Sequence, residues 1–303
     1  MRILVTGASG YVGSRLLERL ARAGHEPRAL ARAGSRVEAA VPIVRGDLVT
    51  GEGLDRALRR IDAAYYLVHS MEPSAEGDFG ARERLAAERF AAAARRAGLQ
   101  RIVYLGGLVP REGPPSEHLA SRLEVERVLL DAVPEATALR SSIVVGARSR
   151  SFRFLVHLVE RLPVLPLPSW RDRRTQPIDE RDLIELLARA VESDALSGRA
   201  FDVAGADIVS YGEMIERIAD LMLVARHRIA LPFSATPLTS RLAAVIGGER
   251  HELVGPLMES LEHDLLPRDA RAAELLGVRP RSFDAAVEHA LRDWETREPL
   301  AAR

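Results

Sequence analysis

Short apolar runs alternate with longer amphipathic segments through the first half of the chain. In the segment from Gly10 to Ala23, Val12, Leu16 and Leu20 recur on one helical face. Several of the apolar runs carry hydrophobic residues at consecutive positions, which is typical of strands that are covered on both faces. This alternation predicts an α/β fold, with a doubly wound parallel sheet between two layers of helices. The predicted strands are residues 2–6, 26–32, 41–48, 63–70, 101–107 and 136–146, and the predicted helices are residues 10–23, 52–60, 79–97 and 116–131.

The pattern becomes less regular after Gly146. Residues 161–170 are rich in proline and cannot form the interior of a helix. Residues 176–191 predict a short strand followed by a helix with Asp179 as its N-cap, and residues 199–205 predict one more strand.

From Ser210 onward the pattern is mostly helical with loop breaks. We therefore expect a main domain and a smaller, mostly helical C-terminal lobe that covers the carboxyl edge of the sheet. The expected main domain is residues 1–150, to which residues 175–205 return, and the expected substrate lobe is residues 151–174 and 206–303.

Composition narrows the classes of protein that fit this pattern. The net charge of the 303 residues is +0, so no overall field attracts nucleic acid or an anionic membrane, and no basic stripe is apparent. Cysteine is absent, which excludes disulfides and thiolate chemistry, and no histidine cluster predicts a metal site. All 43 basic residues are arginine, so no lysine can form a Schiff base. Because a strand begins almost at the first residue and no apolar run is long enough to cross a bilayer, we expect a cytoplasmic protein with no membrane insertion.

The loop after the first strand has the spacing of a phosphate-binding turn. The sequence TGASGYVG places Gly7, Gly10 and Gly13 three residues apart, between a predicted strand and a predicted helix. Glycines in this context allow a tight turn, a close backbone approach to a diphosphate and close packing of helix on strand. The helix N-terminus then directs its amide groups at the phosphates. The predicted dinucleotide-binding residues of this loop are Thr6, Gly7, Ser9, Gly10, Tyr11, Val12 and Gly13.

Together with GDL, YYLVHSM, RIVYLGGL and QPIDERDL, this loop resembles the atypical or extended short-chain dehydrogenase/reductase family, most closely its NmrA-like, NAD(P)H-binding members. The resemblance extends over roughly residues 1–225. It implies a Rossmann-type domain and a bound dinucleotide, but these motifs are not specific for one reaction.

The end of the second predicted strand bears on the choice of dinucleotide. An NAD-selective site carries Asp or Glu there to bind the ribose 2′-hydroxyl. This chain has Arg32, with Arg36 close by, and a guanidinium pairs well with a 2′-phosphate. We therefore expect NADP(H) to be preferred over NAD(H), the alternative being that Arg32 is a solvated loop residue.

Further cofactor contacts are implied by the resemblance alone. Asp47 and Leu48 are expected to flank the adenine ring, although Asp47 could equally be a turn or capping residue. The resemblance places Val68, His69 and Ser70 beside the ribose and diphosphate, and Ser142 near the nicotinamide. His69 taken by itself is more typical of a structural histidine.

Active members of this family use Tyr-x-x-x-Lys on a helix and a Ser or Thr at the end of the fifth strand. Here Gly106 or Gly107 occupies the position of the Ser, and the best match to the Tyr–Lys pair is His118-x-x-x-Arg122. Tyr11 is the only tyrosine with a basic residue four positions on, and it lies inside the glycine motif. The reductase triad is therefore missing from its expected positions.

His118 and Arg122 are the candidate catalytic residues, because residues four apart share one face of a helix. Arg122 could bind the ribose hydroxyls as the Lys does, and its charge would depress the pKa of His118. A neutral imidazole at His118 could hydrogen-bond a carbonyl but would hold few protons to give. The alternative is a surface helix with a scattered His and Arg.

Two functions fit these residues. The first is an oxidoreductase that acts on a small apolar carbonyl or a quinone-like acceptor with little proton assistance. The second is a non-catalytic protein that binds NADP(H) as a redox sensor or as a structural or regulatory ligand. A sugar-nucleotide epimerase fits less well, because such enzymes also rely on the Tyr–Lys pair. We expect a monomer or a homodimer.

Overall fold

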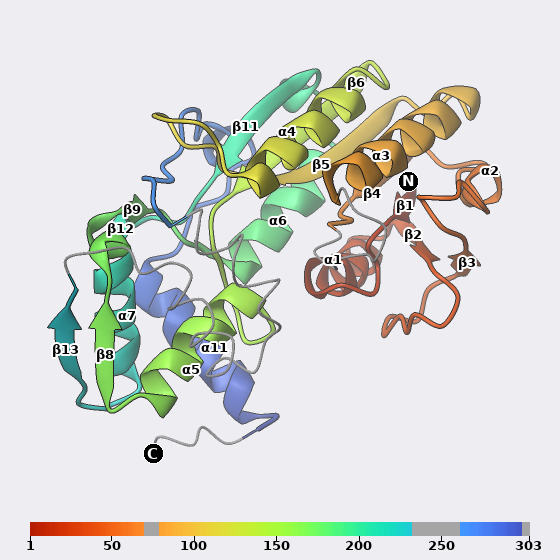
Figure 1. Ribbon diagram of the computed structural model, residues 1–303. Coiled ribbons are helices and arrows are strands. Elements are labelled where there is room, and N and C mark those ends of the chain that lie inside the picture. Colours follow the sequence, from red (N-terminus) through yellow and green to blue (C-terminus); the bar gives the residue numbers. More distant parts are fainter. Residues whose placement is uncertain (70–78, 232–260, 299–303) are drawn as a thin grey trace.

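The computed structural model describes residues 1–69, 79–231 and 261–298, and a parallel sheet of seven strands forms the centre of that part (Figure 1). The strand order is β11-β6-β5-β4-β1-β2-β3, and every neighbouring pair runs parallel. The chain therefore winds outward in both directions from β1, as a doubly wound sheet does. The strands are β1 (Arg2–Val5), β2 (Glu26–Ala31), β3 (Ile43–Arg45), β4 (Ala63–Tyr66), β5 (Arg101–Gly107), β6 (Glu135–Ser141) and β11 (Arg199–Val203).

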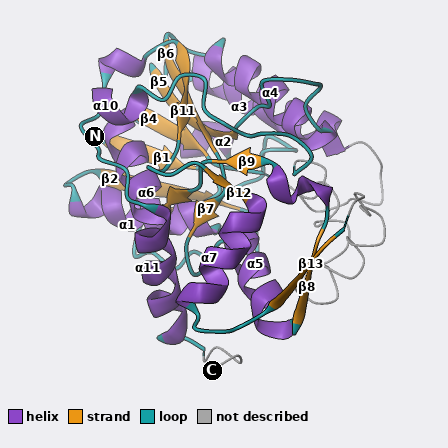
Figure 2. Cartoon of the chain, turned by 90° about the vertical axis from the view of Figure 1, so that its left-hand side faces the viewer, coloured by secondary structure: helices purple, strands orange, loops and turns teal. Residues whose placement is uncertain are grey.

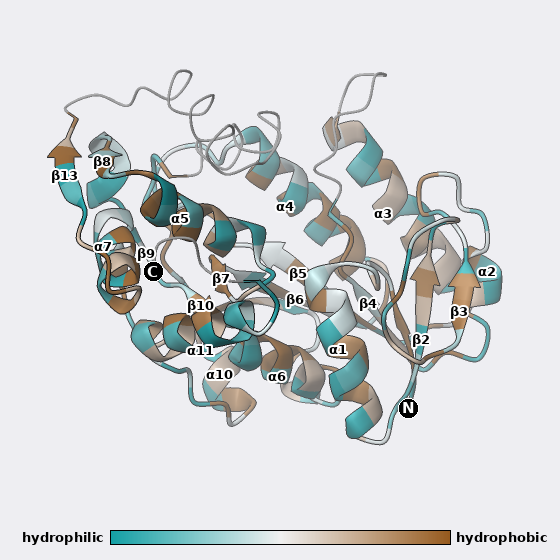
Figure 3. Cartoon of the chain, turned by 90° about the horizontal axis from the view of Figure 1, so that it is seen from below, coloured by the Kyte–Doolittle hydropathy of each residue, from teal (hydrophilic) through white to brown (hydrophobic). Residues whose placement is uncertain are grey.

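Helices cover both faces of this sheet (Figure 3). On one face, Leu16 and Leu20 of α1 share a buried cluster with Leu183 of α6 and Ile3 of β1. On the other face, Phe90 of α3 packs in a second cluster with residues of α4 and α2. The helices are α1 (Tyr11–Arg22), α2 (Leu54–Ala57), α3 (Phe79–Arg96), α4 (Glu117–Leu130), α6 (Glu180–Ala190) and α10 (Ala272–Leu275).

Helices α5, α7 and α11 lie together beside the sheet (Figure 2), and a separate hydrophobic cluster holds them to one another. Phe152 and Val156 of α5 pack there with Met214 of α7 and Trp294 of α11, all of them buried. The elements of this region are α5 (Arg150–Arg161), α7 (Tyr211–Leu221), α11 (Phe283–Glu295), the short helices η1 (Ser169–Asp172) and η2 (Asp194–Leu196), and the paired strands β7 (Val144–Val145) with β10 (Ile178–Asp179), β8 (Val164–Leu167) with β13 (His227–Ala230), and β9 (Arg174–Thr175) with β12 (Val209–Ser210).

The predicted α/β architecture is confirmed, and three details of the element prediction are wrong. Residues 136–146 do not form one strand, because β6 ends at Ser141 and β7 pairs with β10 outside the sheet. The helix predicted at 52–60 is only one turn long. Helix α5 was not anticipated by the pattern. The N-cap role of Asp179 is confirmed, since its carboxylate accepts a hydrogen bond from the Arg181 amide at 2.7 Å. The division into two domains remains a prediction.

Candidate functional site

The glycine-rich loop brings the start of helix α1 against the turn that follows β1, and brings that turn against the backbone at the end of β4. Gly7 has φ +68°, and a Cβ at this position would lie 2.6 Å from the carbonyl oxygen of Leu67. A Cβ on Gly13 would overlap the carbonyl oxygen of Gly7. Only glycine at both positions lets the helix begin this close to the strand.

The N-terminus of α1 fits an anionic ligand. Its N-cap is Gly10, no side chain caps the helix, and its first turn contains no acidic residue. The first amide groups of a helix have no partners within the helix, and the helix dipole favours negative charge at this end. A dinucleotide diphosphate is the group that this arrangement would hold.

A cavity of about 380 Å³ opens beside this helix end, at the carboxyl edge of the sheet. Its walls come from the loops after β1, β2, β3 and β4 and from the start of α3 and α5. The predicted residues that line it are Thr6, Gly7, Ser9, Gly10, Arg32, Asp47, Leu48, Val68 and His69. The predicted residues that do not line it are Tyr11, Val12, Gly13, Ser142, His118 and Arg122, and Ser70 lies outside the described residues.

Arg32 is exposed at the wall of this cavity, and the side chain of Asp47 stabilises the turn after β3. The guanidinium of Arg45 donates to the carbonyl oxygens of Arg32 and Ser35, at 3.0 Å and 2.8 Å, which fixes the loop after β2. Asp47 accepts hydrogen bonds from the amides of Val49 and Thr50, at 2.6 Å and 3.1 Å. Asp47 is therefore a turn residue that also borders the cavity, so both interpretations of it have a basis in the structure.

Ser142 and Tyr11 are predicted cofactor contacts, but their side chains interact with other residues of the protein. The hydroxyl of Ser142 lies 2.6 Å from that of Thr175, so the two share a hydrogen bond. The Tyr11 hydroxyl is buried and packs over Gly146, close to the carboxyl group of Glu180. Only the backbone of Tyr11 is thus directed toward a phosphate at the helix end.

The two candidate catalytic residues meet His69 at the ends of β4 and β5. Burial and the nearby Arg122 charge lower the pKa of His118 to about 3. Burial, followed by the charges of Arg122 and His118, holds the pKa of His69 well below its usual value, although a hydrogen bond with the Leu105 backbone opposes this. Burial also lowers the pKa of Arg122. At neutral pH the cluster therefore holds one cation and two neutral imidazoles.

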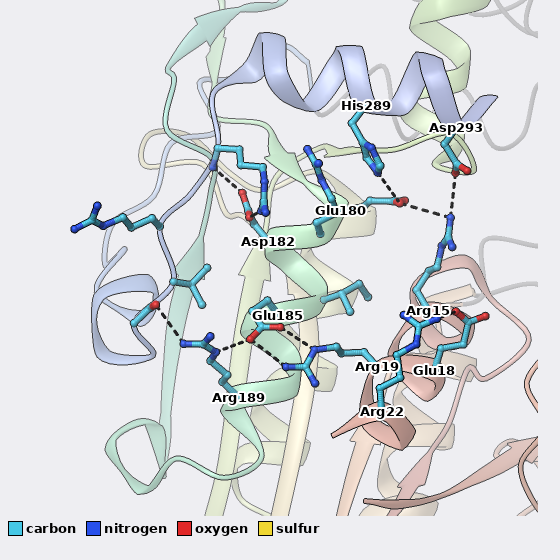
Figure 4. A pocket seen from close by; sticks show the side chains of 16 residues that line it. Arg15, Glu18, Arg19, Arg22, Glu180, Asp182, Glu185, Arg189, His289 and Asp293 are labelled. Carbon is cyan, nitrogen blue, oxygen red and sulfur yellow. Dashed lines mark hydrogen bonds and ion pairs between the residues drawn. The ribbon is translucent and has the colours of Figure 1, made fainter. Parts of the chain in front are cut away.

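A second, shallower cavity of about 630 Å³ lies between α1, α6 and α11 and contains none of the predicted site residues (Figure 4). Its arginines are largely occupied by carboxylates: Arg19 pairs with Glu185 at 2.8 Å, and Arg15 pairs with Asp293 at 3.0 Å. This cavity is a groove crossed by salt bridges, and its charge is mostly compensated within the protein.

Sequence reasoning missed several residues that line the dinucleotide-sized cavity. Arg82 of α3 and Arg150 at the start of α5 add two exposed guanidinium groups to that of Arg32. Neither follows a motif, because each is brought to the cavity by the packing of its helix.

The parallel sheet, the uncapped glycine-rich helix start and the adjoining cavity together define a Rossmann-type dinucleotide-binding protein. The sequence profile of the NAD dependent epimerase/dehydratase family matches residues 3–204, and the chain belongs to this family, within the extended short-chain dehydrogenase/reductase superfamily. Members of the family bind NAD(P) cofactors. Membership does not identify an NmrA-like subtype.

The similar proteins carry names that describe different functions. The chain is 26% identical over 280 residues to a ceramide reductase of Caulobacter vibrioides, covering 90% of this chain and 88% of the relative. It is 24% identical over 253 residues to the NADH dehydrogenase [ubiquinone] 1 alpha subcomplex subunit 9, mitochondrial, of Arabidopsis thaliana; this match covers 79% of the chain and only 62% of the subunit's length.

A solved structure, a nucleoside-diphosphate-sugar epimerase from Staphylococcus aureus, superposes with a TM-score of 0.75 at 15% identity. The superposition covers 95% of this chain and 100% of that one, which supports the fold.

None of the helices in residues 1–69, 79–231 and 261–298 is long and apolar enough to span a bilayer. The same residues contain no group of three or more His, Cys, Asp or Glu side chains arranged to hold a metal ion. Because some relatives are mitochondrial, a cytoplasmic location remains a prediction.

Proposed function

We propose that the protein is an NADP(H)-dependent oxidoreductase that reduces a small apolar carbonyl or a quinone-like acceptor without a Ser-Tyr-Lys triad. One observation carries the proposal: an uncapped, glycine-lined helix start opens on a cavity, and His69, which lines that cavity, also contacts the His118 and Arg122 cluster. A diphosphate at the helix end would direct the rest of the dinucleotide along the carboxyl edge of the sheet toward that cluster.

The chain's own residues bind and orient in this proposal. The glycine loop holds the diphosphate, and Arg32 holds a 2′-phosphate, while Leu48 and Val68 pack on the adenosine. When bound, the cofactor supplies the hydride chemistry. His118, neutral at physiological pH, hydrogen-bonds the acceptor rather than protonating it. Acceptors whose reduced form takes its proton from water suit such a site.

Arg32→Ala is expected to weaken NADPH binding by about tenfold or more while leaving NADH affinity almost unchanged, because only NADPH carries the 2′-phosphate that the guanidinium would bind. Titration of each cofactor by its fluorescence measures both affinities. Arg36→Ala is the matched control, since Arg36 is also exposed but does not line the cavity. Equal losses for NADPH and NADH in Arg32→Ala would contradict the assignment.

The function is tested by following NADPH absorbance with a panel of quinones and aldehydes. We expect turnover with quinones, and kcat/KM that stays flat between about pH 5 and about pH 8, because His118 with a pKa of about 3 does not titrate there. His118→Ala is expected to lower kcat while NADPH affinity is retained. A kcat/KM that falls above about pH 6.5 in the wild type but not in His118→Ala would show that His118 donates a proton after all.

The second candidate function is a non-catalytic NADP(H) sensor or structural protein. The lowered pKa of His118 favours it, since no group of the His69, His118 and Arg122 cluster can readily give a proton at neutral pH. Several relatives are named as subunits of NADH dehydrogenase or NADH-ubiquinone oxidoreductase. Tight NADPH binding with no turnover of any acceptor would favour this function.

A further inference from the structure

The guanidinium of Arg122 forms no ion pair within 4 Å among the described residues. Its Nε atom is buried and has no hydrogen-bond partner among them. Other enclosed arginines are compensated: Arg140 binds Glu126 through two hydrogen bonds of 2.8 Å and 2.6 Å, and Arg101 pairs with Glu135 and Asp194. A cation removed from water without a partner is costly, so Arg122 is a position where an external anion would be stabilised.

Burial, the largest effect, lowers the pKa of Arg122, and the nearby Tyr104 and Glu83 oppose this lowering without forming an ion pair with it. Glu83 is a buried carboxylate nearby, and its Oε2 accepts the hydroxyl of Ser121 at 2.7 Å. Burial and the Arg122 charge keep the pKa values of His69 and His118 low, so both rings stay neutral at physiological pH. The Nε2 atom of His69 is buried and also lacks a partner.

The guanidinium of Arg122 lies close to the end of strand β5. A Cβ built on Gly107, at the end of β5, would be 3.4 Å from Nη1 of Arg122. Because Gly107 has no side chain, the arginine reaches the carboxyl edge of the sheet from helix α4. His69, which belongs to the same cluster, lines the dinucleotide-sized cavity. The positive charge of Arg122 thus lies behind His69, which separates it from that cavity.

We propose that Arg122 is a catalytic residue whose guanidinium binds the acceptor oxygen that becomes anionic during reduction. This rests on the proposed function. The acceptor takes a hydride from the dihydronicotinamide, which is oxidised; a C–H bond forms, the carbonyl π bond or the conjugated π system opens, and the electron pair moves to the oxygen. That oxygen is then protonated by water. Quinones and conjugated enones are the favoured class, because their reduced oxygens are stabilised as anions and need no acid.

The test of Arg122 uses binding rather than turnover. para-Nitrophenol is titrated into the complex with NADP⁺ near its own pKa, and the absorbance of the phenolate reports its ionisation. We expect the bound ligand to be more ionised than the free one, and Arg122→Gln to reduce phenolate affinity by about tenfold or more. Arg127→Gln is the matched control, because Arg127 is an exposed arginine on the same helix. Unchanged phenolate binding in Arg122→Gln overturns the proposal.

Kinetics separate this inference from the function on which it rests. In Arg122→Gln we expect kcat with quinones to fall by about 100-fold while the NADPH Kd stays within a few-fold, and Arg122→Lys to recover part of the loss. A raised NADPH Kd with unchanged phenolate binding would assign Arg122 to the ribose instead. Turnover by the wild type with an unaffected Arg122→Gln variant overturns the role of Arg122 alone, whereas phenolate binding without any turnover overturns the reductase function alone. The thermal unfolding of each variant verifies that it is folded.

Discussion

Gly13→Ala is expected to weaken NADPH binding by at least about 100-fold, which corresponds to about 2.7 kcal/mol. The added methyl group would overlap the carbonyl oxygen of Gly7, a backbone atom that no change of rotamer can move. Helix α1 would have to shift away from β1, and its first amide groups would leave the position where a diphosphate is held. We also expect a loss of about 1–3 kcal/mol in the free energy of unfolding, as for other overpacked sites.

Calorimetric titration with NADPH and urea unfolding measure the two effects separately. Ser14→Ala is the matched control on the next residue of α1, where the hydroxyl donates to the Tyr11 carbonyl at 3.0 Å and lies away from the strand contact. Its expected loss in stability is about 1 kcal/mol, with cofactor affinity retained. NADPH affinity of wild-type strength in a folded Gly13→Ala protein would mean that the glycine loop does not hold the diphosphate.

The fold could be predicted where local sequence and tertiary packing agree. The strand predicted at residues 101–107 is β5 (Arg101–Gly107), because an apolar run between a helix end and a glycine pair leaves little choice of boundary. Helix α5 was missed, since its apolar face packs in a cluster with Trp294, which is distant in sequence. The same limit applies to β7, whose partner β10 lies over thirty residues along the chain and outside the main sheet.

For the candidate site too, the local features could be predicted from the sequence and the features that depend on packing could not. Glycine spacing specified the turn at Gly7 and the start of α1 because those features are local in the chain. The sequence also paired His118 with Arg122 by helical spacing, but it gave no sign that His69 joins them or that the Nε atom of Arg122 is buried without a hydrogen-bond partner among the described residues. Charge compensation is a property of all neighbouring elements, so it becomes visible only when the elements are packed.

Glu180→Gln is expected to stabilise the protein in alkaline solution and to have little effect in acid. Glu180 begins helix α6 in the groove of Figure 4, and its Oε2 is buried without a hydrogen-bond partner. Burial and, to a smaller extent, the charge of Asp293 raise its pKa to about 7. The groups that face it are the Tyr11 hydroxyl, Arg15 at 3.7 Å, His289 at 4.0 Å, Asp293, Arg181 and Arg297.

The sign follows from the raised pKa. In the unfolded chain the carboxyl group ionises near pH 4.5, whereas in the folded protein it keeps its proton to about pH 7. The free energy of unfolding is therefore unaffected below about pH 4.5 and falls between about pH 4.5 and about pH 7. It stays reduced above about pH 7. The full difference corresponds to about 3 kcal/mol, so we expect Glu180→Gln to gain on that order at about pH 8.5. Urea unfolding at about pH 4.5 and about pH 8.5 measures the gain.

Glu185→Gln, one turn further along α6, is the matched control and should change stability in the opposite direction. Hydrogen bonds from Arg19 lower the pKa of Glu185, and Arg189 adds to them despite some burial. A lowered pKa stabilises the folded state above the unfolded value and loses that contribution in acid. Glu185→Gln should thus destabilise the protein at about pH 8.5. If both variants shifted the free energy of unfolding equally at the two pH values, the carboxyl group of Glu180 would not be held protonated by its burial, and the groove would be an ordinary solvated surface.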